Sequence, residues 1–219
     1  MNQTSTQQAG VSGAGAAREK IAGTSARAWG IFLAAFLSSL VLDLWTKVWA
    51  FKTIAGFPVI VQREEVMNVT PDLWRLIPMH QPRVVAEKLL NFTLVLNPGA
   101  VFGIGAGKRW FFITFTAIAM VIGITAFAKF TRDRDWSMQL AIGLIVGSGL
   151  GNLYDRVTFG CVRDFIHPLP GMKLPGGLSW PWGGNEIWPY VSNVADALLI
   201  VGLVMISWRV VFGQKKQGK

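Results

Sequence analysis

The sequence predicts an all-α membrane protein with four transmembrane helices and a small extracytoplasmic β-sheet, a cradle, between the first and second helices. Three observations lead to this fold class. Only 15% of the 219 residues are charged, whereas soluble domains carry roughly 25%. Four apolar runs each approach the roughly 20 residues that cross a bilayer. Several of the ten tryptophans stand at the ends of these runs, where aromatic side chains anchor helices at the membrane interface.

The predicted spans divide the chain into a membrane domain over residues 28–213 and two tails. The spans cover residues 29–50, 110–130, 136–154 and 191–212. Residues 1–27 have the small and polar composition of a flexible tail, and residues 214–219 form a basic tail. The third span contains glycines at four-residue spacing: Gly143, Gly147 and Gly151. This spacing predicts that a neighbouring helix approaches closely.

Two long polar segments, 51–109 and 155–190, join the spans on one side of the bilayer. In the first of them, Phe57–Val61 and Phe92–Leu96 are short runs of apolar, β-branched and aromatic residues. Such runs are typical of strands, so they predict the small sheet. The second segment contains a stretch rich in Pro, Gly and Trp at 167–189, which predicts a surface excursion that is not helical throughout.

The alternating direction of four spans brings four span ends to one face of the membrane. The unusual polar residues of the chain fall at or beside these ends: Asp43, Asn97, Asp155, Asp164 and Asp196. Ionisable groups at membrane depth are costly, and each is therefore a candidate for function. We expect these residues to form one site.

The net charge of +9 does not indicate a nucleic-acid binding protein, because the lysines and arginines are scattered over loops and tails and form no stripe. Attraction to anionic membrane lipids explains the charge better. Ten lysines and arginines lie on the side of the termini and ten on the opposite side. The ten on the terminal side occupy much shorter flanks, so the positive-inside rule places both termini in the cytoplasm.

Asp43 and Lys47 are four residues apart, on one helix face and in the order that favours pairing. They form either a structural ion pair near the interface or a pair that orients the site from one side. Asp155 is adjacent to Arg156, and we expect these two to be paired, with Asp155 ionised and not catalytic.

Asp164 and Asp196 are the candidates for chemistry. Each one alone has the simpler explanation of an aspartate at a span end that reaches water. Together on one face, beside Asn152, Asn193 and Arg156, they predict a pair of carboxylates that act on one bond. Two carboxylates at one site push their pKa values apart, which provides one general acid and one general base.

Other chemistries lack their residues. No metal ion or cofactor is expected, because Cys161, His80 and His167 are too few for a zinc site. The glycines of 103–108 lack the spacing of a phosphate-binding loop. The alternative to an enzyme is a small proton-coupled carrier or a non-enzymatic membrane scaffold. A carrier is expected to hold its acids near the bilayer midplane, and here they gather near one interface.

Five segments of the chain resemble, in order, the signature segments of the lipoprotein signal peptidase family (signal peptidase II). They are Asp43-Leu-Trp-Thr-Lys47, Asn97-Pro-Gly-Ala-Val-Phe-Gly103, Gly151-Asn-Leu-Tyr-Asp-Arg156, Gly160-Cys-Val-Arg-Asp-Phe165 and Asn193-Val-Ala-Asp196. The resemblance implies an intramembrane aspartic peptidase in the bacterial inner membrane, with its active site near the periplasmic face. It implies that Asp164 and Asp196 are catalytic.

The resemblance also implies the partners of the site. The substrate is a prolipoprotein with a diacylglyceryl group on the cysteine that becomes the new N-terminus, and the enzyme cleaves before that cysteine. Membrane lipids surround the chain, the cyclic peptide globomycin inhibits it, and a monomer is expected. The supporting residues carried over are Asp43, Lys47, Asn97, Gly99, Asn152, Arg156, Asn193 and Ala195.

Overall fold

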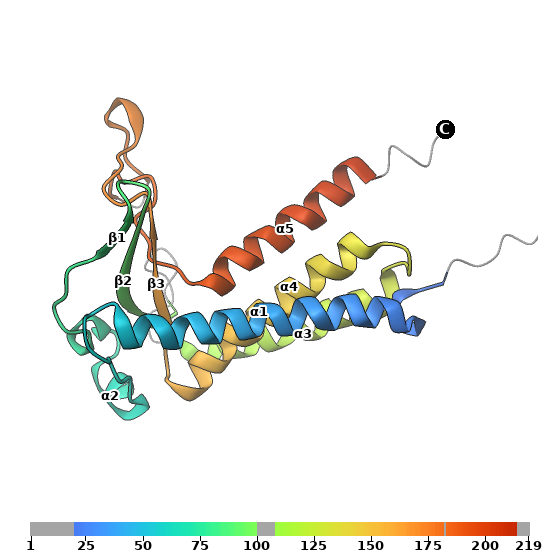
Figure 1. Cartoon of the computed structure of the whole chain (residues 1–219), viewed down its shortest axis with the longest axis horizontal. Coiled ribbons are helices and arrows are strands. Elements are labelled where there is room, and N and C mark those ends of the chain that lie inside the picture. Colours follow the sequence, from blue (N-terminus) through green and yellow to red (C-terminus); the bar gives the residue numbers. More distant parts are fainter. Residues whose placement is uncertain (1–19, 100–107, 182, 214–219) are drawn as a thin grey trace, which may run out of the picture.

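The computed structural model describes residues 20–99, 108–181 and 183–213 (Figure 1). Most of the predicted N-terminal tail, the basic tail at 214–219 and the part of the Asn97–Gly103 segment beyond Gly99 lie outside the described residues. Four long helices form the body of the protein: α1 (Ala26–Thr53), α3 (Arg109–Phe130), α4 (Trp136–Thr158) and α5 (Val194–Gly213). They correspond to the four predicted spans.

Within the described residues, three helices are long and apolar enough to cross a membrane, namely α1, α3 and α5. The third predicted span, α4, is not among them. This helix packs against all three others, and its buried residues include Gln139, Ser148, Asn152 and Asp155. A helix enclosed by its neighbours can carry polar side chains on its inner faces, which lowers its mean hydropathy.

The glycines of α4 lie where α1 packs against it, as their spacing predicts. A Cβ atom on Gly143 would lie 2.6 Å from the carbonyl oxygen of Phe32. On Gly151 it would collide with the carboxylate of Asp43. These glycines therefore let the backbones of α1 and α4 approach closely, and the approach at Gly151 presses Asp43 against α4.

The described end of the predicted tail, residues 20–27, packs against the helices. Helix α1 begins at Ala26, and the hydroxyl of Ser25 caps it by accepting from the N–H of Ala28 at 3.2 Å. The preceding one-turn helix η1 (Ala22–Thr24) packs on the end of α3. Ala22 is fully buried, and its N–H donates to the carbonyl of Thr131 at 2.8 Å.

The predicted sheet exists, but with different strands. Its order is β1 (Arg83–Ala86), β2 (Leu90–Asn97) and β3 (Val162–Pro168), all antiparallel. The run Phe92–Leu96 is part of β2, as predicted. Phe57–Val61 is not a strand: Pro58 has no N–H to give to a sheet, and the N–H of Val59 donates to Phe51 at the end of α1 at 2.7 Å.

Short elements complete the segments around the sheet. They are helix α2 (Arg63–Val69) and the one-turn helices η2 (Leu73–Leu76) and η3 (Pro175–Gly177). The run 167–189 is largely irregular, as its composition predicts. Figure 1 shows the sheet at one end of the long helices, near the last turn of α1 and the first turn of α5.

Strand alternation separates a core face of the sheet from a polar face. Leu94, Leu96 and Phe165 are buried in one apolar cluster with Phe51 of α1. Neighbouring residues on a strand point to opposite faces. Asn97 of β2 and Asp164 of β3 therefore lie together on the other face, and the register supports this because Val95 is paired with Asp164.

Candidate active site

The four aspartates meet at the sheet end of the helices, as the alternation of spans predicts. Asp43 comes from α1, Asp155 from α4, Asp164 from β3 and Asp196 from the first turn of α5. The first three are 0–1% exposed. Hydrogen bonds and ion pairs connect all four through a small set of amides and cations.

Asp164 is held by two side-chain amides. Asn193 Nδ2 donates to its Oδ1 at 2.6 Å, and Asn97 Nδ2 donates to its Oδ2 at 3.1 Å. No lysine or arginine among the described residues forms a salt bridge with it. Burial, with the charge of Asp196 as the second cause, raises the pKa of Asp164 to about 8, and the two amides only partly oppose this rise.

Asp196 is fixed by the start of its own helix. Asn193 is the residue before α5, and its Oδ1 accepts from the N–H of Asp196 at 3.1 Å. In return, Asp196 Oδ2 accepts from the N–H of Asn193 at 3.2 Å. This reciprocal pair is a capping box, which satisfies two backbone donors at the helix start. Asn152 Nδ2 donates to the other oxygen, Oδ1, at 2.9 Å.

Two asparagines join the two carboxylates. Asn193 Nδ2, which donates to Asp164, also donates to Asn152 Oδ1 at 3.1 Å. Lys47 Nζ donates to the same Asn152 oxygen at 2.8 Å. Because the amide oxygen of Asn152 faces these donors, its NH₂ group must face Asp196. A continuous path of amides therefore runs from Asp164 to Asp196.

Asp43 and Lys47 form the predicted ion pair, with Nζ 2.7 Å from Oδ2 and both side chains fully buried. The pair also contacts the site. Asp43 Oδ1 accepts from the N–H of Ala195, the residue before Asp196, at 3.1 Å. The two explanations offered for this pair are therefore compatible, since it is a buried ion pair that holds the first turn of α5.

The predicted pairing of Asp155 with Arg156 is wrong. Adjacent residues on a helix do not face each other, and Asp155 pairs with Arg163 instead. Arg163 donates to Asp155 from Nη2 at 2.8 Å, from Nε at 3.3 Å and from its backbone N–H at 3.0 Å. Lys47 lies 3.4 Å from the same carboxylate. The sequence reasoning missed Arg163, and the only signal for it was its position next to Asp164.

Arg156 instead turns toward the candidate catalytic pair. Its guanidinium lies 5.3 Å from the ring centre of Phe112, and Nη1 donates to the carbonyl of Asn152 at 3.3 Å. Asp196 and Asp164 attract it electrostatically most strongly, and Asp155 does so less.

Gly99 supports Asn97 at the edge of the described segment. The N–H of Gly99 donates to Asn97 Oδ1 at 2.9 Å, which leaves the NH₂ of Asn97 for Asp164. Gly99 has φ +96°, a conformation that favours glycine. A Cβ atom there would also lie 2.7 Å from the ring of Phe112.

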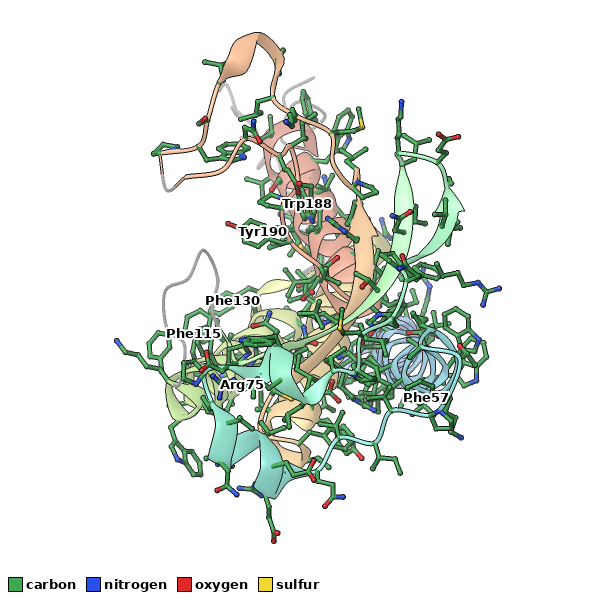
Figure 2. All side chains as sticks on the ribbon, turned by 90° about the vertical axis from the view of Figure 1, so that its left-hand side faces the viewer. Phe57, Arg75, Phe115, Phe130, Trp188 and Tyr190 are labelled. Carbon is green, nitrogen blue, oxygen red and sulfur yellow. The ribbon has the colours of Figure 1, made fainter. Side chains whose placement is uncertain are left out.

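An apolar groove leads along the helices to this site. A cavity of about 160 Å³ between α3, α4 and α5 is bordered by Asn152 and Arg156 at its polar end. A larger apolar cavity of about 530 Å³ continues between the same helices and shares Phe115 with the first. Figure 2 marks α3 with Phe115 and Phe130, both of which line the larger cavity. Among the described residues, no group of three or more His, Cys, Asp or Glu gathers to hold a metal ion.

Comparison with known proteins agrees with this arrangement. A family model described as signal peptidase (SPase) II matches residues 35–212. The lipoprotein signal peptidase of Desulfitobacterium hafniense (strain DSM 10664 / DCB-2) is 36% identical over 136 residues, which cover 62% of this chain and 78% of the relative. That of Methylorubrum extorquens (strain PA1) is 31% identical over 176 residues, covering 78% and 80%.

The fold has a counterpart among solved structures. A structure described as a bacterial membrane enzyme, determined by the in meso method, has a TM-score of 0.59 and 24% identity, and the match covers 87% of this chain and 92% of the other. At this identity the likeness concerns the fold alone. With the family model matching most of the chain, the helices, the sheet and the site at their junction are those of a bacterial membrane protein that belongs to the signal peptidase II family, the lipoprotein signal peptidases.

Proposed function

We propose that this protein is an aspartic endopeptidase that hydrolyses the peptide bond before the lipid-modified cysteine of diacylglyceryl-modified prolipoproteins. Its family membership makes it a membrane peptidase that removes signal peptides from prolipoproteins. The observation that carries the aspartic mechanism is the amide path from Asp164 to Asp196. It holds two carboxylates at one site, and no salt bridge among the described residues engages either of them.

In the proposed mechanism the two carboxyl groups share one proton. Asp164, with its raised pKa, carries it at neutral pH, and Asp196 is the base. Water attacks the scissile carbonyl carbon, Asp196 takes the proton of that water, and Asp164 donates its proton to the carbonyl oxygen. In the second step the carbon–nitrogen bond breaks, Asp196 protonates the leaving nitrogen, and the hydroxyl proton of the intermediate returns to Asp164.

The supporting residues have distinct parts in this proposal. Asn97, Asn152 and Asn193 hold the acids, and the second N–H of Asn97 and of Asn152 can donate to the extended substrate backbone. Arg156 stabilises the negative charge of the pair. Asp43 and Lys47 hold the first turn of α5 and the amide of Asn152.

The membrane arrangement follows from the same proposal. All four long helices span the bilayer, both termini are cytoplasmic, and the site lies near the periplasmic face. The apolar groove between α3, α4 and α5 supports entry of the lipid-anchored substrate from the side, within the bilayer. Remote anchoring by the acyl chains positions the bond to be cut. We expect globomycin to compete for this site.

The decisive experiment measures cleavage of a diacylglyceryl-modified prolipoprotein by purified protein in lipid vesicles. We expect Asp164→Asn and Asp196→Asn each to lower kcat by about 10²–10⁴-fold, because each removes one of the two proton-transfer groups. Asp72→Asn is the matched control, since Asp72 lies in an exposed ion pair with Arg75. Near-normal cleavage by either of the first two variants, with thermal unfolding unchanged, would sink the mechanism.

A further inference from the structure

We propose that a cavity beside β2 binds the first residues of the mature lipoprotein, those that follow the lipid-modified cysteine, in extended conformation. This inference rests on the proposed function. The cavity has a volume of about 330 Å³ and lies outside the groove between the helices. It is lined by Trp74, by Ile77 to His80 and by Leu94 to Leu96.

The cavity lies on the approach to the candidate catalytic pair. Its wall on one side is β2 itself, and β2 ends at Asn97, whose amide donates to Asp164. The opposite wall is formed by Trp74 of η2 and by the segment that follows η2, Ile77 to His80. A chain that occupies this cavity can therefore continue along the strand to the bond that is cut.

The strand offers backbone groups to such a chain. Strand β1 pairs with β2 only as far as Phe92, so beyond Phe92 none of the described strands lies beside β2 on the edge opposite β3. The backbone N–H of Arg163 donates to Asp155, so it points away from β2. Leu96 is paired in register with Arg163, and in an antiparallel pair of this kind both residues turn their N–H and C=O groups outward. Those of Leu96 therefore face the edge on which the cavity lies.

A hydrogen bond to His80 indicates that the backbone N–H of Leu94 faces the same edge of β2 as that of Leu96. The N–H of Leu94 donates to His80 Nε2 at 3.0 Å, and His80 Nδ1 lies 2.9 Å from the carbonyl of Pro78. The ring thus fastens the far wall of the cavity to the edge of β2 and takes the place that a neighbouring strand would take. An extended peptide that pairs with Leu96 would add to the sheet by strand addition, in which main-chain hydrogen bonds give affinity and side-chain pockets give specificity.

The two cavities suit the two halves of the substrate. The groove between α3, α4 and α5 is apolar and lies among the helices, which fits the signal peptide and the acyl chains. The cavity beside β2 lies among the segments that join α1 to α3. It therefore suits the part of the substrate that lies outside the membrane. Its lining side chains, chiefly Trp74, Ile77, Pro78 and Met79, select an apolar residue shortly after the cysteine.

The test compares prolipoproteins that differ only in the four residues after the lipid-modified cysteine. We expect wild-type kcat/KM to be about tenfold or more higher for leucine than for glutamate at one of these positions, the effect of a small apolar pocket. Trp74→Ala should abolish this preference. Trp208→Ala on α5 should retain it, because Trp208 is about as exposed as Trp74 but lies outside the cavity.

Two further measurements separate this proposal from general damage. Met79→Glu changes a fully exposed side chain and should favour lysine over glutamate at the same position. Replacing single substrate amides by esters should lower kcat/KM about two- to tenfold at one position, where a backbone hydrogen bond to Leu96 is lost. Equal preferences in wild type, Trp74→Ala and Met79→Glu would overturn the inference. Failure of the wild type to cleave any prolipoprotein would instead refute the proposed function.

Discussion

Two pairs of aspartates share one buried cluster, and they differ in what faces them. Asp43 and Asp155 are held by the cations of Lys47 and Arg163. Asp164 and Asp196 are held by asparagine and backbone amides. A cation keeps a buried carboxylate ionised, whereas amide donors position a carboxyl group that still exchanges its proton. The first pair is suited to structure and the second to chemistry.

The charges of the cluster support this division. Three cations, Lys47, Arg156 and Arg163, stand near four aspartates. The cluster is neutral when the four carboxyl groups carry three negative charges, that is, when one proton remains. A single proton shared by the proposed catalytic pair is thus compatible with the formal charges around it.

The largest expected effect comes from removing a cation from the structural pair. Lys47→Met leaves Asp43 without its partner, and breaking a buried ion pair costs about 3–5 kcal/mol of unfolding free energy. Thermal unfolding in detergent micelles measures this loss. Arg75→Met is the control, because its ion pair is exposed and should contribute within about 0.5 kcal/mol. A Lys47→Met protein as stable as wild type would contradict the division into two pairs.

A smaller effect is expected at Asn193, where two variants separate its role in capping α5 from its role in holding Asp164. Asn193→Ala removes both the helix cap and the amide that reaches Asp164, and should cost about 1–2 kcal/mol of stability as well as most of the activity. Asn193→Ser restores a capping oxygen but not the NH₂ donor. We expect it to recover the stability and to remain at least about tenfold less active. Equal recovery of both quantities would show that the amide has no part in catalysis.

A pH dependence also distinguishes the two pairs. Asp164 must be protonated in the proposed mechanism, so activity should fall as the pH rises through about 8. The raised pKa of Asp164 also determines whether the free energy of unfolding rises or falls with pH. The unfolded carboxyl ionises near pH 3.8, and above that pH the fold is progressively destabilised by this group until about pH 8. Asp164→Asn should flatten this part of the stability profile. A profile of the same slope in both proteins would contradict the raised pKa.

Local spacing predicted part of the site correctly, because a helix fixes its own neighbours. Asp43 and Lys47 are one turn apart on α1, and their ion pair needs no knowledge of the rest of the fold. The wrong pairing of Asp155 came from reading sequence adjacency as spatial adjacency. Its true partner, Arg163, arrives through β3, and the register of a sheet is not determined by one strand alone.

The strands of the sheet could likewise be predicted only where local sequence determines them. The run Phe92–Leu96 was predicted as a strand because it is apolar and β-branched, and it is the central strand of the sheet. Strand β1 is short and largely exposed, so no apolar pattern marks it. Phe57–Val61 has a strand-like composition but covers the end of α1, where tertiary packing overrides β-propensity.

The contact between Asp43 and the backbone of Ala195 joins positions 152 residues apart. This contact makes the site depend on the last helix to be synthesised. Until α5 exists, both Asp196 and the donor for Asp43 are missing, so a chain truncated before α5 should have no peptidase activity.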